Sequence, residues 1–534
     1  MASALSFDSG IESLKAVINT TNVLRLVGLW VLYHVLVALY NISPLHPLSR
    51  FPGPKLAAAT VAYEAYFDLL KGGRYSWEIK RMHEKYGPIV RINPFELHCN
   101  DPAFIDEIYA AGGRKRNKSP HTLESMSWPF SITGFGTADH DLHRIRRLPM
   151  GKHFSRQQML RLEPDIRRTL GKFVGKLFRY AADHPEPFDV AMAYSCFTSD
   201  VISEYSFGEP LGLLEQDGWE PNWRAPLYAF LRTTFLFRFF PVVKNLAEVG
   251  NIFARKGWMG PDIKMLMDTL LVVLPNRIEK TRKDAEAGIV REREAVYLDI
   301  FKSTALPESE KTMPRLSGEG MALMNAGTDT SGWAITVMTY HVLSKPAVLA
   351  RLTAELEEAG LNEDNLSWAA LEKLPYLSGV IQEGLRLSYG VSARSPRIPT
   401  EEDLVYRGES KGEGKVEYFI PRGWAIGCSA AVMHHNEDVF PDSHTFKPER
   451  WFDEEGNKRK DLEKCLLSFS RGSRQCLGMS LAYCEIYLTV ALFVLKVFPR
   501  MTLFETTEED VKYDHDMFVP IPKDGTKGVR VVVA

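Results

Sequence analysis

The sequence predicts a mainly α-helical protein with small β-sheets, in which one large domain follows an N-terminal transmembrane helix. Three observations support this fold class. The twenty residues from 23 to 42 are almost entirely apolar. Most of the chain from about 57 to 387 has helical periodicity, apart from short β-type segments at 88–92 and 95–99. No later linker rich in proline, glycine or serine divides the body.

The composition is typical of a globular protein with a large core. Of the 534 residues, 45% are hydrophobic and 25% are charged. The 65 basic and 67 acidic residues give a net charge of −2, so no overall field favours nucleic acid as a partner. The six cysteines are dispersed without a CxxC pair, which fits a reducing compartment and argues against a disulfide scaffold or a zinc module.

The apolar run at 23–42 is expected to be a membrane anchor. Twenty helical residues span about 30 Å, the thickness of the hydrocarbon core, and only Arg25 and His34 in the run ionise readily. A cleaved signal peptide is less favoured, because 22 residues that include Asp8 and Glu12 precede the run. A buried core helix remains an alternative. Basic residues are balanced on both sides, so charge does not set the orientation.

A proline-rich segment follows at 43–54, with four prolines in twelve residues. Such a segment is stiff and cannot continue a helix. It predicts a fixed offset between the membrane and the body at 55–534. An ordinary interdomain linker would predict nearly the same arrangement.

A loop near the C-terminus carries the clearest chemical signal. Cys476 precedes the apolar run 481–498, so its sulfur lies at the start of a helix, where the dipole favours thiolate over thiol and a thiolate can bind iron. Gly472 and Gly478 permit sharp turns and close approach of a flat macrocycle. Phe469 can screen the sulfur from water, and Arg474 can reach an anionic group on the ring. A buried structural cysteine is the alternative.

The pattern Phe-x-x-Gly-x-Arg-x-Cys-x-Gly at 469–478 resembles the haem-binding loop of the cytochrome P450 family. This resemblance implies a haem-thiolate domain with Cys476 as the axial iron ligand, and a monooxygenase that inserts oxygen from O2 into an apolar substrate. It also implies a single-pass protein of the endoplasmic reticulum membrane, with 1–22 in the lumen, 43–54 as the hinge of microsomal members, and 55–534 in the cytosol. The chain has no flavin or nucleotide-binding motif, so the expected electron donor is the separate NADPH-cytochrome P450 reductase.

The segment 320–343 is apolar nearly all round, as expected for a central helix, while the polar tract 307–319 before it suits a surface loop. The helix contains Asp329 beside Thr330, whose hydroxyl can bond to the Ala326 carbonyl and open the helix locally. The segment 326–331 matches the oxygen-activating motif of the family. The resemblance therefore implies proton delivery by Asp329 and Thr330; a purely structural kink is the alternative.

Glu383 and Arg386 are three residues apart on a predicted helix. Two other Glu-x-x-Arg pairs occur in the chain, but only this one has flanking apolar residues. A buried pair needs a further partner, and the resemblance supplies Arg450 as the third member of a structural network. Trp451 stands where the family usually has phenylalanine.

His143 and Arg147 share a helical face. The resemblance makes Arg147 a ligand of a haem propionate and puts His143 in the usual place of a tryptophan. A solvated basic face shared with Arg144 and Arg146 is the alternative.

The loop 391–397 is implied to pass over the haem edge. Residues 391–393 would line the substrate pocket and Arg397 would bind a propionate, with Arg394 as its rival for that contact. The aromatic run 228–243 is either ordinary core or the apolar roof of the pocket near the membrane.

The segments 51–73, 86–98 and 139–147 are similar to fungal members of the family that resemble trichodiene oxygenase. This similarity implies a terpenoid or a related apolar polycycle of secondary metabolism, with polyketides and alkaloids also open. Two rival functions remain. A haem-thiolate isomerase would need no reductase and no Asp329–Thr330 pair. A non-catalytic haem-binding membrane protein would show haem spectra without consuming NADPH.

Overall fold

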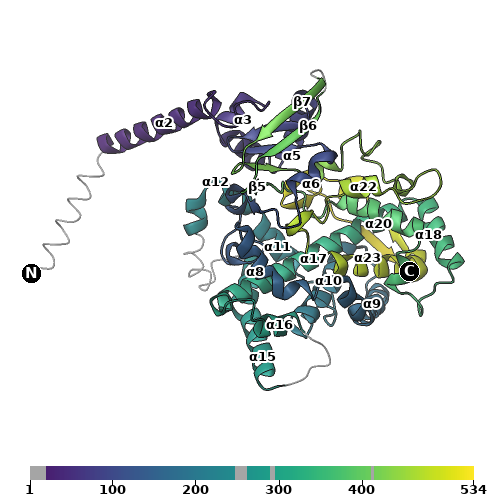
Figure 1. Cartoon of the computed structure of the whole chain (residues 1–534). Coiled ribbons are helices and arrows are strands. Elements are labelled where there is room, and N and C mark those ends of the chain that lie inside the picture. The colour runs from purple at the N-terminus through teal and green to yellow at the C-terminus, as the bar shows by residue number, and fades with distance from the viewer. Residues whose placement is uncertain (1–19, 247–260, 289–294, 411–413) are drawn as a thin grey trace, which may run out of the picture.

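The computed structural model describes residues 20–246, 261–288, 295–410 and 414–534. Most of the predicted luminal segment, at 1–19, therefore lies outside the described residues. The described chain is a helical body with small sheets at its periphery (Figure 1). The predicted fold class, mainly α with small β-sheets, is confirmed.

The longer helices form most of the body. They are α2 (Thr20–Ile42), α5 (Tyr75–Tyr86), α8 (His140–Gly151), α9 (Arg156–Asp183), α10 (Val190–Phe207), α11 (Arg224–Leu231), α12 (Thr234–Phe239), α14 (Pro261–Asp268), α15 (Leu274–Glu286), α16 (Val296–Lys302), α17 (Met313–Leu343), α18 (Pro346–Glu358), α20 (Pro375–Ser388), α22 (Lys460–Cys465) and α23 (Met479–Leu492). Shorter helical turns are α3 (Lys55–Ala59), α4 (Ala62–Ala65), η1 (Tyr66–Leu70), α6 (Ile105–Ile108), α7 (Pro120–Leu123), α19 (Trp368–Leu371), α21 (Ala430–Met433), η6 (Pro448–Trp451) and η7 (Gly472–Arg474).

The largest sheet has five strands in the order β1 (Ile89–Asn93), β2 (Glu96–Cys99), β8 (Ala425–Gly427), β5 (Arg397–Pro399) and β3 (Arg116–Lys118). Only the β2–β8 pairing in it is parallel. The strands predicted at 88–92 and 95–99 are present as β1 and β2, shifted by one residue. Smaller sheets pair β6 (Leu404–Ser410) with β7 (Gly414–Ile420), β10 (His515–Met517) with β11 (Val519–Ile521), and β12 (Arg530–Val533) with both β4 (Phe188–Asp189) and β9 (Met501–Leu503).

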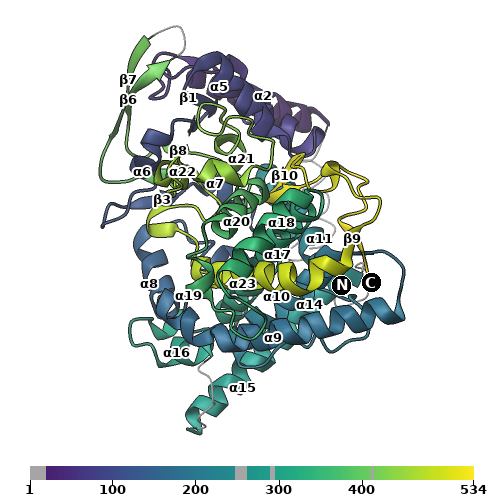
Figure 2. The same ribbon diagram turned by 90° about the vertical axis from the view of Figure 1, so that its right-hand side faces the viewer.

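The helix α17 runs through the middle of the body and packs against α10, α20 and α23 (Figures 1 and 2). Gly327 permits close approach to α10, because a Cβ there would lie 2.6 Å from Ile202 Cγ1. The helix begins at Met313, so the loop predicted over 307–319 is wrong for its second half. Those polar residues are accommodated because Arg315 and Glu319 form a buried ion pair at 3.1 Å.

The N-terminal helix α2 projects from the body (Figure 1), and none of its apolar window at Thr21–Ile42 is buried. A second apolar helix, Met479–Arg500, is 83% buried and belongs to the core. The base of α2 is tied to the body, since Asn41 Nδ2 donates to the Ala59 carbonyl at 2.9 Å and Arg91 Nη1 donates to the Asn41 carbonyl at 2.9 Å. The start of the proline-rich segment is therefore held on β1 and α3.

Candidate active site

The cysteine loop connects α22 to α23 and is shaped by a tight turn. Gly472 has φ 73°, and a Cβ at this position would lie 2.0 Å from the Tyr109 carbonyl oxygen, so only glycine fits. The Cys476 N–H donates to the Phe469 carbonyl at 2.9 Å. Gly478 directly precedes α23, so the loop presents Cys476 at the start of that helix. The Phe469 ring packs against Tyr483, with 5.1 Å between centroids.

Cys476 is the one exposed cysteine of the six, and it lies three residues before the start of α23. Burial nevertheless raises the pKa of its thiol, and a backbone bond from Gly478 and the charge of Arg147 offset part of that rise. The sequence argument, that the helix end favours thiolate, therefore omitted the larger desolvation effect. A metal cation at the sulfur would reverse the balance, because a coordinating thiol loses its proton.

The face of α17 around the predicted motif is open, in contrast with the rest of the helix. Ala326 is exposed and Thr330 is half-buried, whereas Met324 and Thr328 on the opposite side are buried. An exposed residue in the middle of a buried helix indicates an open space beside it, which we call the central hollow. The Thr330 hydroxyl donates to the Ala326 carbonyl at 2.7 Å, as predicted. The helix is nevertheless α-helical throughout, so the predicted local opening is absent.

Asp329 faces α11 rather than solvent. Its Oδ1 lies 3.6 Å from Arg224 Nε, and the Tyr228 hydroxyl donates to its Oδ2 at 3.4 Å. Burial raises the pKa of Asp329, and these two partners offset part of the rise. Arg224 also approaches Asp189, with 3.7 Å between Nη1 and Oδ2. Sequence reasoning found Asp329 but missed Arg224 and Tyr228, because no local spacing links 224 and 228 to α17.

Five basic side chains converge near the cysteine loop. Burial, together with the charges of Arg397 and Arg147, lowers the pKa of Arg474 to about 10. Arg397 and Arg474 likewise act on Lys118, whose pKa burial already lowers. Burial and these cations lower the pKa of His143 to about 2. Like charges gathered at a buried position need an anionic partner.

The residues present therefore fit a haem, whose two propionates supply that anionic partner. Arg474 donates to the Thr137 and Ala138 carbonyls at 2.6 Å each, and its buried Nε has no partner among the described residues. Arg397 donates to the Ser395 and Pro396 carbonyls through Nη1 alone. Lys118 was not predicted from the sequence, since a lysine in a short strand carries no motif.

The three arginines of α8 have different surroundings, which separates the two interpretations of Arg147. Arg147 Nη1 donates to the Gln475 carbonyl at 2.7 Å, next to Cys476. Arg146 pairs with Glu310 at 2.7 Å, and Arg144 is exposed. A shared solvated face therefore describes Arg144 alone.

Arg394, the rival of Arg397, lies in a different environment. It forms an ion pair with Glu64 and approaches Glu96 Oε1 at 3.4 Å. We call this buried cluster the Glu64 network; its members are Glu64, Asp68, Glu96, His121, Arg238, Arg394 and Asp516. Arg394 is thus committed to carboxylates of the protein.

Glu383 and Arg386 form the predicted buried pair at 2.7 Å, and Arg450 Nε donates to Glu383 Oε1 at 2.9 Å. Trp451 joins them, since its Nε1 donates to Glu383 Oε2 at 3.0 Å. We call these four residues the Glu383 network. The change from phenylalanine to tryptophan, which looked mild in the sequence, adds a donor to the buried carboxylate.

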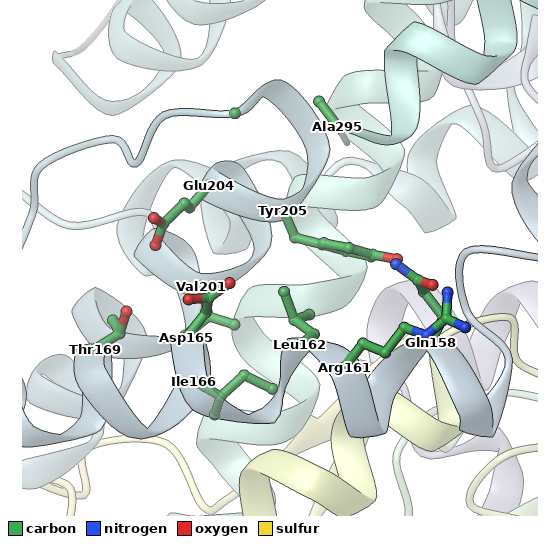
Figure 3. Close-up of a pocket in the computed structure, with 11 residues that line it drawn as sticks. Gln158, Arg161, Leu162, Asp165, Ile166, Thr169, Val201, Glu204, Tyr205 and Ala295 are labelled. Atoms are coloured by element: carbon green, nitrogen blue, oxygen red, sulfur yellow. The ribbon is translucent and has the colours of Figure 1, made fainter. Parts of the chain in front are cut away.

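A separate cavity of about 350 Å³ lies between α9, α10 and the start of α16 (Figure 3). Its acidic side chains Asp165 and Glu204 both pair with Arg168 at 2.8 Å. None of the predicted site residues lines it. We therefore assign it no part in the chemistry.

Comparison with known proteins agrees with this geometry. The family model described as "Cytochrome P450" matches residues 66–524. The chain is 36% identical to "Conidiogenone synthase PchP450" of Penicillium rubens, over 92% of this chain and 94% of that protein. It is 35% identical to "Cytochrome P450 monooxygenase TRI4" of Trichoderma arundinaceum, over 96% of each. It is also 35% identical to "N-acetyltryptophan 6-hydroxylase ivoC" of Emericella nidulans, over 94% of this chain and 96% of that protein.

These matches cover the whole helical body, including the cysteine loop and the open face of α17. The resemblance to fungal members that the sequence indicated is confirmed. The chain belongs to the cytochrome P450 family, as a monooxygenase of fungal secondary metabolism whose cofactor is a thiolate-ligated haem.

Proposed function

We propose that this monooxygenase hydroxylates an apolar terpenoid or a related polycyclic intermediate. The observation that carries the proposal is the open face of α17, where Ala326 and Thr330 face free space beside a buried acid, Asp329. The relative named conidiogenone synthase, together with the similarity of 51–73 and 139–147 to terpenoid-oxidising fungal members, supports this substrate class.

Each residue of the site has a proposed role. Cys476 binds the haem iron through its sulfur, Phe469 shields that sulfur, and Gly478, where a Cβ would meet open space, leaves room for the macrocycle. Arg147, Arg397 and Arg474 bind the propionates, with His143 and Lys118 beside them. When bound, the haem supplies dioxygen activation, which a cysteine ligand favours.

Asp329 and Thr330 are proposed to deliver protons to the oxygen. A buried carboxyl with a raised pKa holds a proton closer to neutral pH than an ordinary aspartate. Arg224 and Tyr228 keep that carboxyl turned toward α11, so it must turn away from Arg224 to reach the hollow. The Thr330 hydroxyl, which lies on the open face of α17, then directs the proton from Asp329 toward the oxygen.

The cellular setting is part of the proposal. The helix at 23–42 would cross the endoplasmic reticulum membrane once, with 1–22 in the lumen, the hinge at 43–54, and the catalytic domain at 55–534 in the cytosol. NADPH-cytochrome P450 reductase of the same membrane would then supply electrons. The exposed apolar surface of α2 supports the anchor.

The test is turnover in yeast microsomes that contain the full chain and the reductase, with a terpenoid panel, NADPH and ¹⁸O2. We expect labelled, hydroxylated product that depends on NADPH. Thr330→Ala is expected to keep the haem spectrum but divert NADPH into hydrogen peroxide. Product formed without NADPH would instead establish the isomerase, and a substrate-induced spectral shift without NADPH consumption would establish a non-catalytic carrier.

A further inference from the structure

Asn325 on α17 has an orientation that is fixed by a neighbour. The Trp223 Nε1–H donates to Asn325 Oδ1 at 2.6 Å. An indole nitrogen can only donate, so the amide oxygen must face Trp223 and the amide NH₂ must point elsewhere. Trp223 itself is fully buried at the start of α11, so it cannot easily move away.

The amide NH₂ of Asn325 has no acceptor among the described residues, since its one hydrogen bond there uses the oxygen. The residue is half-buried, and it is adjacent to the exposed Ala326 on the open face of α17. The nearest polar side chains that follow it on the helix are used, because Asp329 binds Arg224 and Thr330 binds the Ala326 carbonyl. Two N–H donors therefore remain at the edge of the central hollow.

The hollow near these donors is largely apolar. Half-buried Ala322 and Leu323 lie on the same open face. On α11, the helix that Trp223 precedes, Leu227 and Leu231 form an apolar cluster with Val519. The Asn325 Nδ2 is not among the buried polar atoms that lack partners, so water can occupy it in the free protein. A substrate oxygen that replaces this water keeps the hydrogen bond, whereas a hydrocarbon that displaces it loses the bond.

We propose that Asn325 is a specificity-determining residue that donates a hydrogen bond to an oxygen of the substrate. This inference rests on the proposed function and sharpens it. The substrate is an apolar skeleton that already carries a carbonyl or hydroxyl oxygen. That oxygen lies about 7 Å along the helix axis from the level of Thr330, where we propose that oxygen is inserted. The enzyme that acts before it must therefore be one that leaves an oxygen on the skeleton, such as an earlier oxygenase.

The test uses matched hydrocarbon and oxygenated probes with the haem-loaded full chain: valencene with nootkatone, and cedrene with cedrol. Binding is measured by titration of the Soret difference spectrum. In the wild type we expect the oxygenated member of at least one pair to bind about five- to twentyfold tighter. Asn325→Leu should abolish that preference while leaving the hydrocarbon affinity within about twofold.

Two further variants separate the hydrogen bond from shape. Asn325→Asp keeps the shape and still accepts from Trp223, but it replaces the donor by an acceptor, so it should abolish or reverse the preference for a ketone. Leu323→Val changes the volume of the same face and should alter both members of a pair in parallel.

The proposal is overturned if no oxygenated probe is preferred by the wild type, or if Asn325→Leu keeps the preference. If Asn325→Leu weakens the binding of both members of a pair equally, the proposal is also overturned. Asn325 would then only bind water or shape the hollow. The carbon monoxide spectrum of each variant is the separate check on the proposed function, because a missing haem-thiolate band would refute that function and not the role of Asn325.

Discussion

Two buried ion networks of this protein use the same residue types but are balanced differently. In the Glu383 network, one carboxylate receives Arg386, Arg450 and the Trp451 indole. In the Glu64 network, four carboxylates share two arginines and one histidine. Atoms of Glu96, Arg238 and Arg394 in it lack hydrogen-bond partners among the described residues.

The difference shows that buried charged groups can either stabilise or destabilise the fold, depending on whether the charges balance. The Glu383 network is saturated and also holds the region of the cysteine loop, because Arg386 donates to the His434 carbonyl and His434 Nε2 accepts from the Leu467 N–H. The Glu64 network is short of positive charge, and burial raises the pKa of Asp68 to about 7. Its residues come from segments distant in sequence, so its excess negative charge weakens the packing of these segments against one another instead of stabilising it.

The largest expected effect is at Glu383. Glu383→Gln leaves Arg386 and Arg450 buried without a counter-ion, which should cost about 3–5 kcal/mol of unfolding free energy and reduce haem content. Urea unfolding measures the first effect and the pyridine haemochrome assay the second. Glu279→Gln is the matched control, because it belongs to a solvent-screened Glu-x-x-Arg pair and should leave unfolding nearly unchanged. Equal effects of the two variants would contradict the contrast.

The opposite sign is expected at Asp68. Its folded pKa lies above the unfolded value, so unfolding free energy falls as pH rises from about 4 to about 7 and stays lower above that. Asp68→Asn removes this penalty and should stabilise the protein by about 1–3 kcal/mol at pH 8, with a smaller gain at pH 5. Thermal unfolding between pH 5 and 8 measures it, and destabilisation at pH 8 would refute the claim of excess acid.

His434, whose carbonyl accepts from Arg386 of the Glu383 network, should instead make the protein less stable in acid. Burial lowers the pKa of His434 to about 3. A depressed histidine pKa means that its stabilisation is complete above about pH 6.5 and is lost as pH falls toward 3, because only the unfolded chain takes up the proton. His434→Gln should therefore flatten the pH dependence of unfolding between 6.5 and 4. An unchanged slope would show that His434 is not the group that titrates.

The smallest expected effect is at Trp451. Trp451→Phe keeps the ring in the core but removes the Nε1 donor to Glu383. Loss of one bond to a carboxylate that retains two arginines should cost about 1–2 kcal/mol. Urea unfolding of this variant measures the loss, and a loss as large as that of Glu383→Gln would mean that packing, not the hydrogen bond, dominates.

The same contrast explains what the sequence could predict. Glu383, Arg386 and the residues at 469–478 lie within short stretches, where helical spacing and turn chemistry limit the geometry. The Glu64 network joins positions from 64 to 516 that share no spacing, so nothing local indicates it. Arg394 was for that reason a plausible propionate partner in the sequence, and only the fold shows its carboxylate partners.

At two other places tertiary packing adds an effect that the sequence does not display. The polar tract at 313–319 is helical because its charges find partners, Glu319 with Arg315 and the Gly134 N–H. At Cys476 the expected effect of the helix end is present but partial, because burial raises the pKa of the thiol while the Gly478 backbone lowers it. In both places tertiary packing has the larger effect, on the secondary structure of 313–319 and on the pKa of Cys476. Helix propensity and the helix dipole are only local contributions.

The most direct test of the central claim is the carbon monoxide difference spectrum of the reduced full chain, for the wild type and for Cys476→Ala. The account predicts a strongly red-shifted Soret band in the wild type that is lost in the variant, because it assigns the thiolate ligand of the haem iron to Cys476. A wild type that shows the band of histidine-ligated haem, or a Cys476→Ala variant that keeps the red-shifted band, would contradict the account.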